Sequence, residues 1–467
     1  MTDLMAARVQ MGFSLGFHMI FAAFGVGMPL LMLLAEGIGI ARRRPHYLAL
    51  AKSWAKLTAA FFAIGAVSGT ALSFELGLLW PAFMQRFGPV IGPAFTAEAF
   101  AFFLEAIFLA LYVYGWDRLR PWAHWLTGWG VAVFSAASSV LVSSANAWMQ
   151  NPVGAEAWLR SDGAVASPAR LLFANPTWPV MALHSTLATY AATAFAMAGA
   201  YAWWARKHAA AGTLDGTRRE RIHAALVVTL AVGAVVAALM PITGDASARL
   251  VAHQQPVKLA AMESQFRTEA GAPLRIGGWP DVEGRRVIGA VEIPHALSWL
   301  AYRDPTAPVQ GLDKTPADRW PNVPVTHLSF QAMVGAGIAM LAVAAWFWWT
   351  YARRRGQIWS PLPRWLLGAL AVSSPLGLVA LEAGWVVAEV GRQPWIVYGV
   401  MRTGEAVTPA AGIQATLMAF LGLYLLLGGA LMWLIRRLNW TGLTSPGSEE
   451  LAARAHDRPD TAKEAWV

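Results

Sequence analysis

The sequence contains no cysteine. This absence excludes disulfide bonds, haem attached through thioether bonds, and iron–sulfur clusters held by cysteine thiolates. Any metal or cofactor must therefore be held by histidine, methionine or carboxylate side chains.

Charged residues are also scarce. They make up 13% of the 467 residues, against about a quarter in soluble domains, while 57% are hydrophobic and the mean hydropathy is +0.45. The 24 tryptophans are typical of an aromatic belt at the membrane interfaces. The net charge is +9, and the basic residues lie in short loops between apolar runs. We therefore expect a membrane protein and no nucleic-acid partner.

Nine apolar runs of about twenty residues predict an all-α polytopic bundle with nine transmembrane helices. Six helices occupy 1–242, a polar segment fills 243–326, three helices occupy 327–444, and 445–467 is expected to be a disordered cytoplasmic tail. The start of the chain lacks the features of a removable signal peptide, so we expect the first span to be retained. The predicted spans are 10–35, 55–79, 93–115, 125–147, 178–204, 222–242, 327–350, 364–388 and 411–435.

Lysine and arginine predict the orientation of the bundle, because basic loops remain in the cytoplasm. One set of loops is strongly basic and the opposite short loops are not, which places the N-terminus outside, the C-terminus in the cytoplasm and segment 243–326 outside. The basic loops and flank carry Arg42, Arg43, Arg44, Lys52, Lys56, Arg118, Arg120, Arg206, Lys207, Arg218, Arg219, Arg221, Arg353, Arg354, Arg355, Arg364, Arg436 and Arg437.

Two histidines, His18 and His184, fall clearly inside apolar spans, and Met333 lies at a depth similar to that of His184. A histidine and a methionine are a known axial pair for an electron-transfer haem. Methionine more often fills a core, and a membrane histidine often only bonds a neighbouring helix, so both interpretations remain open from the residues alone.

Two acids, Glu98 and Glu105, lie nearly two turns apart on one face of the third span. Carboxylates in so apolar a run are costly unless they face a cavity, a metal, a proton path or a basic partner. Ser138 and Asn146 on the fourth span could extend a polar track beside them, although small polar residues also serve ordinary helix packing.

Glu389 and Arg392 lie three residues apart in the string Gly384-Trp-Val-Val-Ala-Glu-Val-Gly-Arg-Gln-Pro-Trp395 at the end of the eighth span. Together with His18, His184, Met333 and Glu98, Glu389 is expected in the outer third of the bilayer, which indicates a cofactor layer there. In the outward segment, Lys258 and Glu263 taken alone predict a solvated helix with an ordinary charge pair.

Several segments in the right order resemble subunit I of the cytochrome bd-type quinol oxidases, from the first span almost to the ninth. They are Gly16-Phe-His18, Ala101-Phe-Phe-Leu-Glu105, Gly115-Trp-Asp-Arg-Leu119, Ala145-Asn-Ala-Trp-Met-Gln-Asn-Pro152, Lys258-Leu-Ala-Ala-Met-Glu263 and the string from Gly384 to Trp395.

The resemblance implies a low-spin haem b, a high-spin haem b and a haem d, or a further haem b in place of d. By motif, His184 and Met333 correspond to the ligands of the low-spin haem, and His18 and Glu389 to those of the two high-spin centres. The order of His18 and Glu389 between those two centres stays open.

The same resemblance implies further roles. Glu98 falls beside the oxygen-reactive pair, and Glu105 and Ser138 fall on a proton route from the cytoplasm. Trp385 lies between haems and Arg392 near their propionates. Lys258 and Glu263 match residues implicated in quinol binding, in the outward segment called the Q loop.

The implied activity is that of a terminal oxidase in the cell (inner) membrane. Quinol is oxidised at the outer face and dioxygen is reduced to water with protons from inside, which builds a proton gradient without a pump. The implied partners are a homologous second large subunit, small single-helix subunits and membrane lipid.

The sequence departs from the pattern of this family at two places, and two other classes of membrane protein are alternatives. Gln331 stands where the family often has arginine, two positions before the methionine ligand, and Glu98 and Glu105 are one residue closer than in some members.

A proton-coupled transporter would show inverted repeats and broken helices, and the sequence predicts neither. A cytochrome b relay would have no need of His18 and Glu389 at an open site.

Overall fold

The computed structural model describes residues 2–160, 167–357, 359, 363–438 and 441, and the predicted tail 445–467 lies outside them. Within these residues nine helical spans are long and apolar enough to cross a membrane, which confirms the predicted fold class. They are α1 (Asp3–Ala41), α2 (Pro45–Leu79), α3 (Pro81–Gly115), α4 (Pro121–Gln150), α7 (Trp178–Ala210), α8 (Gly216–Gln254), α11 (Val323–Arg353), α12 (Arg364–Ser373) with α13 (Leu376–Val390), and α15 (Ile413–Arg437).

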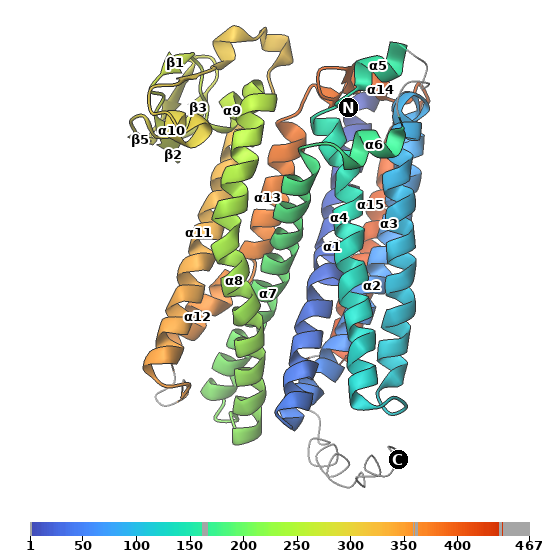
Figure 1. Ribbon diagram of the computed structural model, residues 1–467, viewed down its shortest axis with the longest axis vertical. Helices are drawn as coiled ribbons and strands as arrows, with labels where there is room; N and C mark the ends of the chain where they lie inside the picture. The colour runs from blue at the N-terminus through green and yellow to red at the C-terminus, as the bar shows by residue number, and fades with distance from the viewer. Residues whose placement is uncertain (1, 161–166, 358, 360–362, 439–440, 442–467) are drawn as a thin grey trace, which may run out of the picture.

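The helices form two groups (Figure 1). Helices α1 to α4 and α15 make one group, and α7, α8, α11, α12 and α13 make the other. Helices α1 and α4 pack against α7 and so join the two groups. The site residues predicted from the sequence are divided between both groups.

Most helices are longer than the predicted spans. Helix α1 has 39 residues, about 58 Å at 1.5 Å per residue, against about 30 Å of hydrocarbon. Helix α3 starts at Pro81 and not at 93, and α8 continues to Gln254 and not to 242. Hydropathy marks only the part of a helix that meets lipid, whereas backbone hydrogen bonding continues through the polar ends.

The eighth span is broken, contrary to the predicted single helix 364–388. Helix α12 ends at Ser373 and α13 starts at Leu376, because Pro375 has no N–H to continue the ladder. The Ser374 hydroxyl donates to the Ala196 carbonyl oxygen on α7 at 3.1 Å. The expectation that no transmembrane helix is interrupted is therefore wrong.

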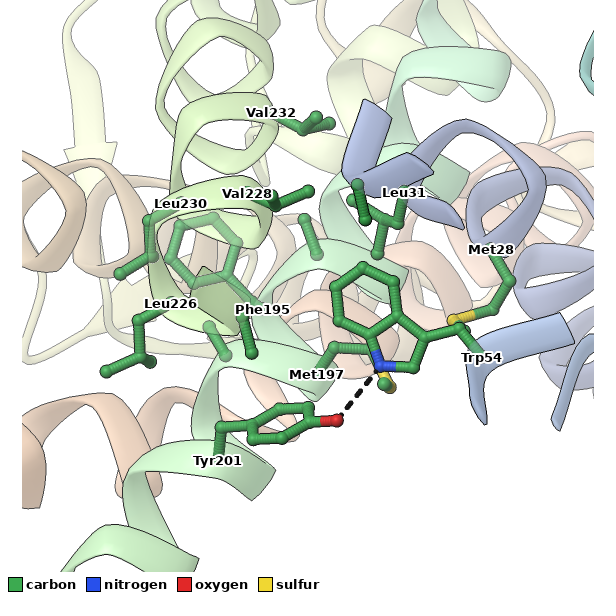
Figure 2. Packing of buried hydrophobic residues seen from close by; sticks show 14 of the residues in the cluster. Met28, Leu31, Trp54, Phe195, Met197, Tyr201, Leu226, Val228, Leu230 and Val232 are labelled. Atoms are coloured by element: carbon green, nitrogen blue, oxygen red, sulfur yellow. Dashed lines mark hydrogen bonds between the residues drawn. The ribbon is translucent and has the colours of Figure 1, made fainter. Parts of the chain in front are cut away.

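A buried hydrophobic core joins α1, α2, α7 and α8 (Figure 2). Trp54 is fully buried, and its Nε1 donates to the Tyr201 hydroxyl at 3.1 Å. That hydroxyl in turn donates to the Thr441 carbonyl oxygen at 3.1 Å. Met28 of α1 and Phe195 of α7 pack in the same cluster. Because lipid is as apolar as these side chains, close packing and the paired indole hold these helices together.

A mixed segment between α8 and α11 covers one end of the second helix group (Figure 1). Its strands form short antiparallel pairs, β1 with β6, β2 with β5 and β3 with β4. Its elements are α9 (Pro256–Met262), β1 (Glu269–Ala270), β2 (Leu274–Ile276), β3 (Trp279–Asp281), β4 (Arg286–Ile288), β5 (Val291–Ile293), α10 (Ala296–Tyr302), β6 (Pro308–Val309), η1 (Leu312–Lys314) and η2 (Ala317–Arg319). We call residues 255–322 the outer segment.

The N-terminus lies at the same end of the bundle as the outer segment (Figure 1). The sequence placed both on one side of the membrane, and the side that this end faces stays a prediction. The remaining short elements lie at this end too. They are α5 (Ala155–Arg160), α6 (Pro168–Phe173), α14 (Thr403–Ala406), β7 (Trp395–Val397) and β8 (Met401–Arg402).

Candidate functional site

His184 is held on α7 by a hydroxyl of α8. Its Nδ1 lies 2.9 Å from the Thr243 Oγ1, and that hydroxyl is also placed to donate to the Leu239 and Met240 carbonyl oxygens of its own helix. The hydroxyl therefore accepts from the Nδ1–H, which leaves the lone pair of Nε2 available to bind a metal. Beside the ring, a Cβ at Gly244 would lie 3.5 Å from the His184 Cε1, at ordinary van der Waals contact.

Met333 of α11 faces a second glycine. A Cβ at Gly384 on α13 would lie 2.9 Å from the Met333 Sδ, too close for a real side chain. Both helices belong to the group that contains α7 and α8. One imidazole and one thioether, each next to a glycine, are thus supplied within a single helix group.

His18 of α1 repeats the arrangement of His184. Its Nδ1 lies 3.0 Å from the Ser68 Oγ on α2, and the Ser68 hydroxyl donates to the Gly65 carbonyl oxygen at 3.1 Å. The same reasoning leaves the lone pair of the His18 Nε2 available to bind a metal. A Cβ at Gly69 would lie 3.0 Å from the His18 Cε1, a tight contact, so glycine leaves room for this edge of the ring.

These donors fit haem better than a bare ion. No group of three or more His, Asp or Glu residues in the described part of the chain could hold a metal ion. Haem supplies four nitrogen ligands itself and needs only one or two axial ligands from the protein. Single imidazoles with an oriented Nε2, and a thioether beside a glycine, satisfy that requirement.

Glu389 lies near the end of α13, and both of its carboxylate oxygens have partners. Asn146 Nδ2 donates to its Oε1 at 2.9 Å, and Arg392 Nη2 pairs with its Oε2 at 2.5 Å. The Arg392 side chain is 4% exposed and that of Glu389 is 21% exposed. Asn146 thus holds Glu389 and does not extend a track beside the acids of α3.

Gln150 connects the outer segment to α13. Its Nε2 donates to the Asn146 Oδ1 and the Ala388 carbonyl oxygen, both at 3.1 Å. Its Oε1 accepts from Lys258 Nζ at 2.5 Å, and Lys258 also donates to the Ala388 carbonyl oxygen at 3.1 Å. The outer segment is therefore bonded to the residue that precedes Glu389.

Lys258 and Glu263 are buried, which overturns the expectation of a solvated helix. Each is 3% exposed, and neither is the other's ion-pair partner in the described residues. Burial, reinforced by the nearby Arg392 charge and opposed by Glu389, lowers the pKa of Lys258 to about 7. Burial raises the pKa of Glu263 to about 8, although Arg275 opposes that shift. The Glu263 Oε2 is buried without a hydrogen-bond partner in the part of the chain described.

The two acids of α3 have no basic partner within 4 Å among the described residues. Ser138 donates to the Glu98 Oε1 at 3.0 Å, and Glu105 is 4% exposed. An ion pair with a basic residue therefore does not explain why either acid stands in this apolar helix. Ser138, expected with Glu105 on one route, contacts Glu98.

Trp385 links the His18 region to α13. A Cβ at Gly16, two residues before His18, would lie 3.8 Å from the Trp385 Cζ3 and 3.3 Å from the Glu382 Oε2. The Glu382 Oε1 is buried without a hydrogen-bond partner in the described part of the molecule. Sequence reasoning missed Glu382, although an acid in the middle of an apolar span was the available signal.

Other buried polar groups were also missed. His124 Nδ1 lies 2.6 Å from the Glu36 Oε1, and the two residues are 2% and 1% exposed. Glu75 accepts from Gln10 Nε2 at 2.9 Å, and His327 is fully buried. The sequence analysis counted only His18 and His184 clearly inside apolar spans. That interpretation was too narrow, because one predicted span began just after His124 and another began at His327.

Comparison with known proteins decides the family. The family model described as cytochrome bd terminal oxidase subunit I matches residues 6–442. The chain belongs to this family. A cytochrome bd subunit I uses haem cofactors, and the family membership confirms a multi-pass membrane oxidase.

Several relatives cover nearly the whole chain. A putative cytochrome bd menaquinol oxidase subunit I of Bacillus subtilis is 34% identical over 93% of this chain and 96% of the relative. The cytochrome bd ubiquinol oxidase subunit 1 of the same organism is 30% identical over 94% and 93%. The bd oxidase structure from Geobacillus thermodenitrificans has a TM-score of 0.84 and 36% identity, and the match covers 93% of this chain and 98% of that one.

Proposed function

We propose that the chain is the haem-carrying subunit of a quinol:oxygen oxidoreductase that reduces dioxygen to water. The observation that carries the proposal is the paired arrangement at His184 and His18. In each, a hydroxyl on the neighbouring helix fixes Nδ1, so Nε2 is oriented for iron.

Four side chains are assigned to haem. His184 and Met333 would hold the low-spin haem b, and His18 and Glu389 the two high-spin centres, one b and one d or a second b. When bound, these groups supply one-electron transfer and the reduction of dioxygen. Arg392 neutralises Glu389 and offers buried positive charge to propionates, and Trp385 packs between the His18 helix and α13.

Quinol is assigned to the outer segment. Glu263 has a buried carboxyl oxygen without a partner in the described residues, so it accepts a proton from a quinol hydroxyl there. Lys258 orients that segment through Gln150 and Ala388. Two quinols are oxidised for each dioxygen reduced, and their protons leave at the outer face.

Protons for water are assigned to the opposite side. Glu105 and the Glu98–Ser138 pair bind and release protons at their carboxyl oxygens between the cytoplasm and the His18 region. Uptake inside and release outside create a proton gradient without a pump. The haem-type donors and the family membership favour this activity over a carrier, even though the eighth span is broken.

The proposed partners and location follow from the family. They are a homologous second large subunit, small single-helix subunits and lipid of the cell inner membrane, with the N-terminus outside and the C-terminus in the cytoplasm. Relatives named for menaquinol and for ubiquinol are both similar to this chain, so quinol is proposed as the substrate class.

The proposal is tested on the purified complex. Its haem content is measured by pyridine haemochromogen spectra, and its activity is measured as quinol-dependent oxygen uptake. Met333→Leu should change the low-spin haem b bands and leave the carbon monoxide-binding bands in place, because it removes one thioether ligand. A colourless wild-type complex overturns the proposal, and unaltered low-spin bands in the variant remove Met333 from the ligand set.

A further inference from the structure

His327 attaches two distant parts of the outer segment to α11. It is fully buried, with Nδ1 at 2.8 Å from the Met262 carbonyl oxygen and Nε2 at 3.2 Å from the Gly277 carbonyl oxygen. Both acceptors are carbonyl oxygens, which cannot donate. The imidazole therefore donates to the outer segment from a ring nitrogen that carries a proton.

Gln331, one turn further along α11, completes the attachment. Its Oε1 accepts from the Gly277 backbone N–H at 3.0 Å, and its Nε2 donates to the Arg275 carbonyl oxygen at 2.9 Å. Gly277 has a φ of +68°, a conformation that glycine adopts without strain. The backbone N–H and carbonyl of this one glycine are thus both bonded to side chains of α11.

These contacts of His327 and Gln331 join the proposed quinol-oxidising residues to the proposed ligand helix. Met262 directly precedes Glu263, and Met333 follows Gln331 by two residues. Arg275 is itself fixed, because its Nη1 donates to Gln265 at 2.5 Å and its Nε to Glu292 at 2.9 Å. The guanidinium also lies close enough to act on the charge of Glu263.

We propose that His327 and Gln331 are positioning residues for quinol oxidation, which hold Glu263 and the turn 275–277 at a fixed place relative to Met333. The proposal rests on the proposed function, since it assigns these residues to its quinol site. It explains what glutamine does at position 331: an arginine has no acceptor for the Gly277 N–H, whereas the glutamine amide both accepts and donates.

His327→Phe and Gln331→Leu in the intact complex test the proposal. Phenylalanine keeps a ring but removes both ring nitrogens, and leucine keeps a branched apolar stem but removes the amide. The matched control is Leu328→Ala, adjacent on α11 and 37% exposed. Each protein is assayed for quinol KM and kcat, oxygen uptake with a phenylenediamine dye that reduces haem directly, low-spin haem spectrum, and tryptic cleavage at the loop arginines.

We expect quinol KM to rise at least about tenfold in both variants, because each loses one or two of the hydrogen bonds that attach the outer segment to α11. Dye-driven oxygen uptake and the low-spin bands should match wild type, and tryptic cleavage of the outer segment should be faster. The control should behave as wild type throughout.

Two results would overturn the proposal. One is an unchanged quinol KM with normal haem bands, which shows that the attachment does not position the quinol site. The other is loss of the low-spin bands in both variants, which shows that the two residues build the haem site instead. A wild-type complex that consumes oxygen with the dye but never with quinol refutes the proposed function itself, and the proteolysis arm then still reports whether the attachment exists.

Discussion

His18 and His184 lie in different helix groups, yet the same local geometry orients both. Each gives its Nδ1–H to a hydroxyl that donates in turn to its own helix backbone. The sequence could single out the two histidines as candidates because ionisable groups are rare in apolar spans. Ser68 and Thr243 were not predictable, since small hydroxyls are common in membrane helices and only the helix pairing selects these two.

Glu105→Gln tests the assignment of the deep acid on α3. The variant keeps the shape of the side chain but cannot carry a proton, so quinol-dependent oxygen uptake should fall at least about a hundredfold while haem spectra stay normal. Glu156→Gln on the exposed helix α5 is the matched control. Normal turnover in Glu105→Gln would remove this residue from the proton route.

Glu263→Gln tests the quinol-side acid through its pH dependence. Burial raises the pKa of Glu263 to about 8, so the carboxyl is neutral below that pH and becomes a proton acceptor above it. Quinol-dependent oxygen uptake by the wild type should therefore rise as pH increases through about 8, and the variant should lack this rise. Glu283→Gln at an exposed hairpin tip serves as the control, and an identical rise in Glu263→Gln would contradict the assignment.

At the scale of elements, hydropathy predicted the number of spans but not their limits. Helix α8 passes 242 because Thr243, Gly244 and the polar residues after them continue the backbone ladder without being apolar. The interruption between α12 and α13 was hidden because Pro375 stands in an otherwise apolar run. The break depends on a contact that the sequence does not display, between Ser374 and the Ala196 carbonyl of α7.

Gly377→Ala tests the close approach of α13 to α7. A Cβ at Gly377 would press on the backbone of Ala192, and overpacking of this kind costs about 1–3 kcal/mol. We expect a lower melting temperature and weaker low-spin haem bands, because α7 carries His184 and α13 packs on the helix of Met333. Gly422→Ala is the matched control, since no atom lies within 4 Å of a Cβ there. Equal behaviour of the two variants would show that this contact does not position the haem ligands.

At the scale of the molecule, the sequence predicts the N-terminus and the outer segment on one side of the membrane, and both lie at the same end of the bundle (Figure 1). The basic residues of the loops determined the orientation of the spans. Counting the spans between those loops then placed the N-terminus and the outer segment. The bonds that join the outer segment to the bundle, through Gln150, His327 and Gln331, could not be predicted because they link residues far apart in sequence.

The absence of cysteine makes the orientation directly testable. Single cysteines at Glu283, in the outer segment, and at Ala211, between α7 and α8, lie at exposed positions at opposite ends of the bundle. In intact cells a membrane-impermeant thiol reagent should label Glu283→Cys and not Ala211→Cys, with the reverse in inside-out vesicles. Labelling of Ala211→Cys in intact cells would invert the predicted topology.

Helix α8 runs unbroken from Gly216 to Gln254, and α9 follows after the single residue Gln255. Adding or deleting one residue beyond Gly244 would turn everything after it by about 100° and carry Lys258 away from Gln150. Length variation is therefore forbidden on this side of the outer segment but permitted at the solvent-facing hairpin tip 283–285. That tip is where a reporter peptide could be spliced into the folded oxidase.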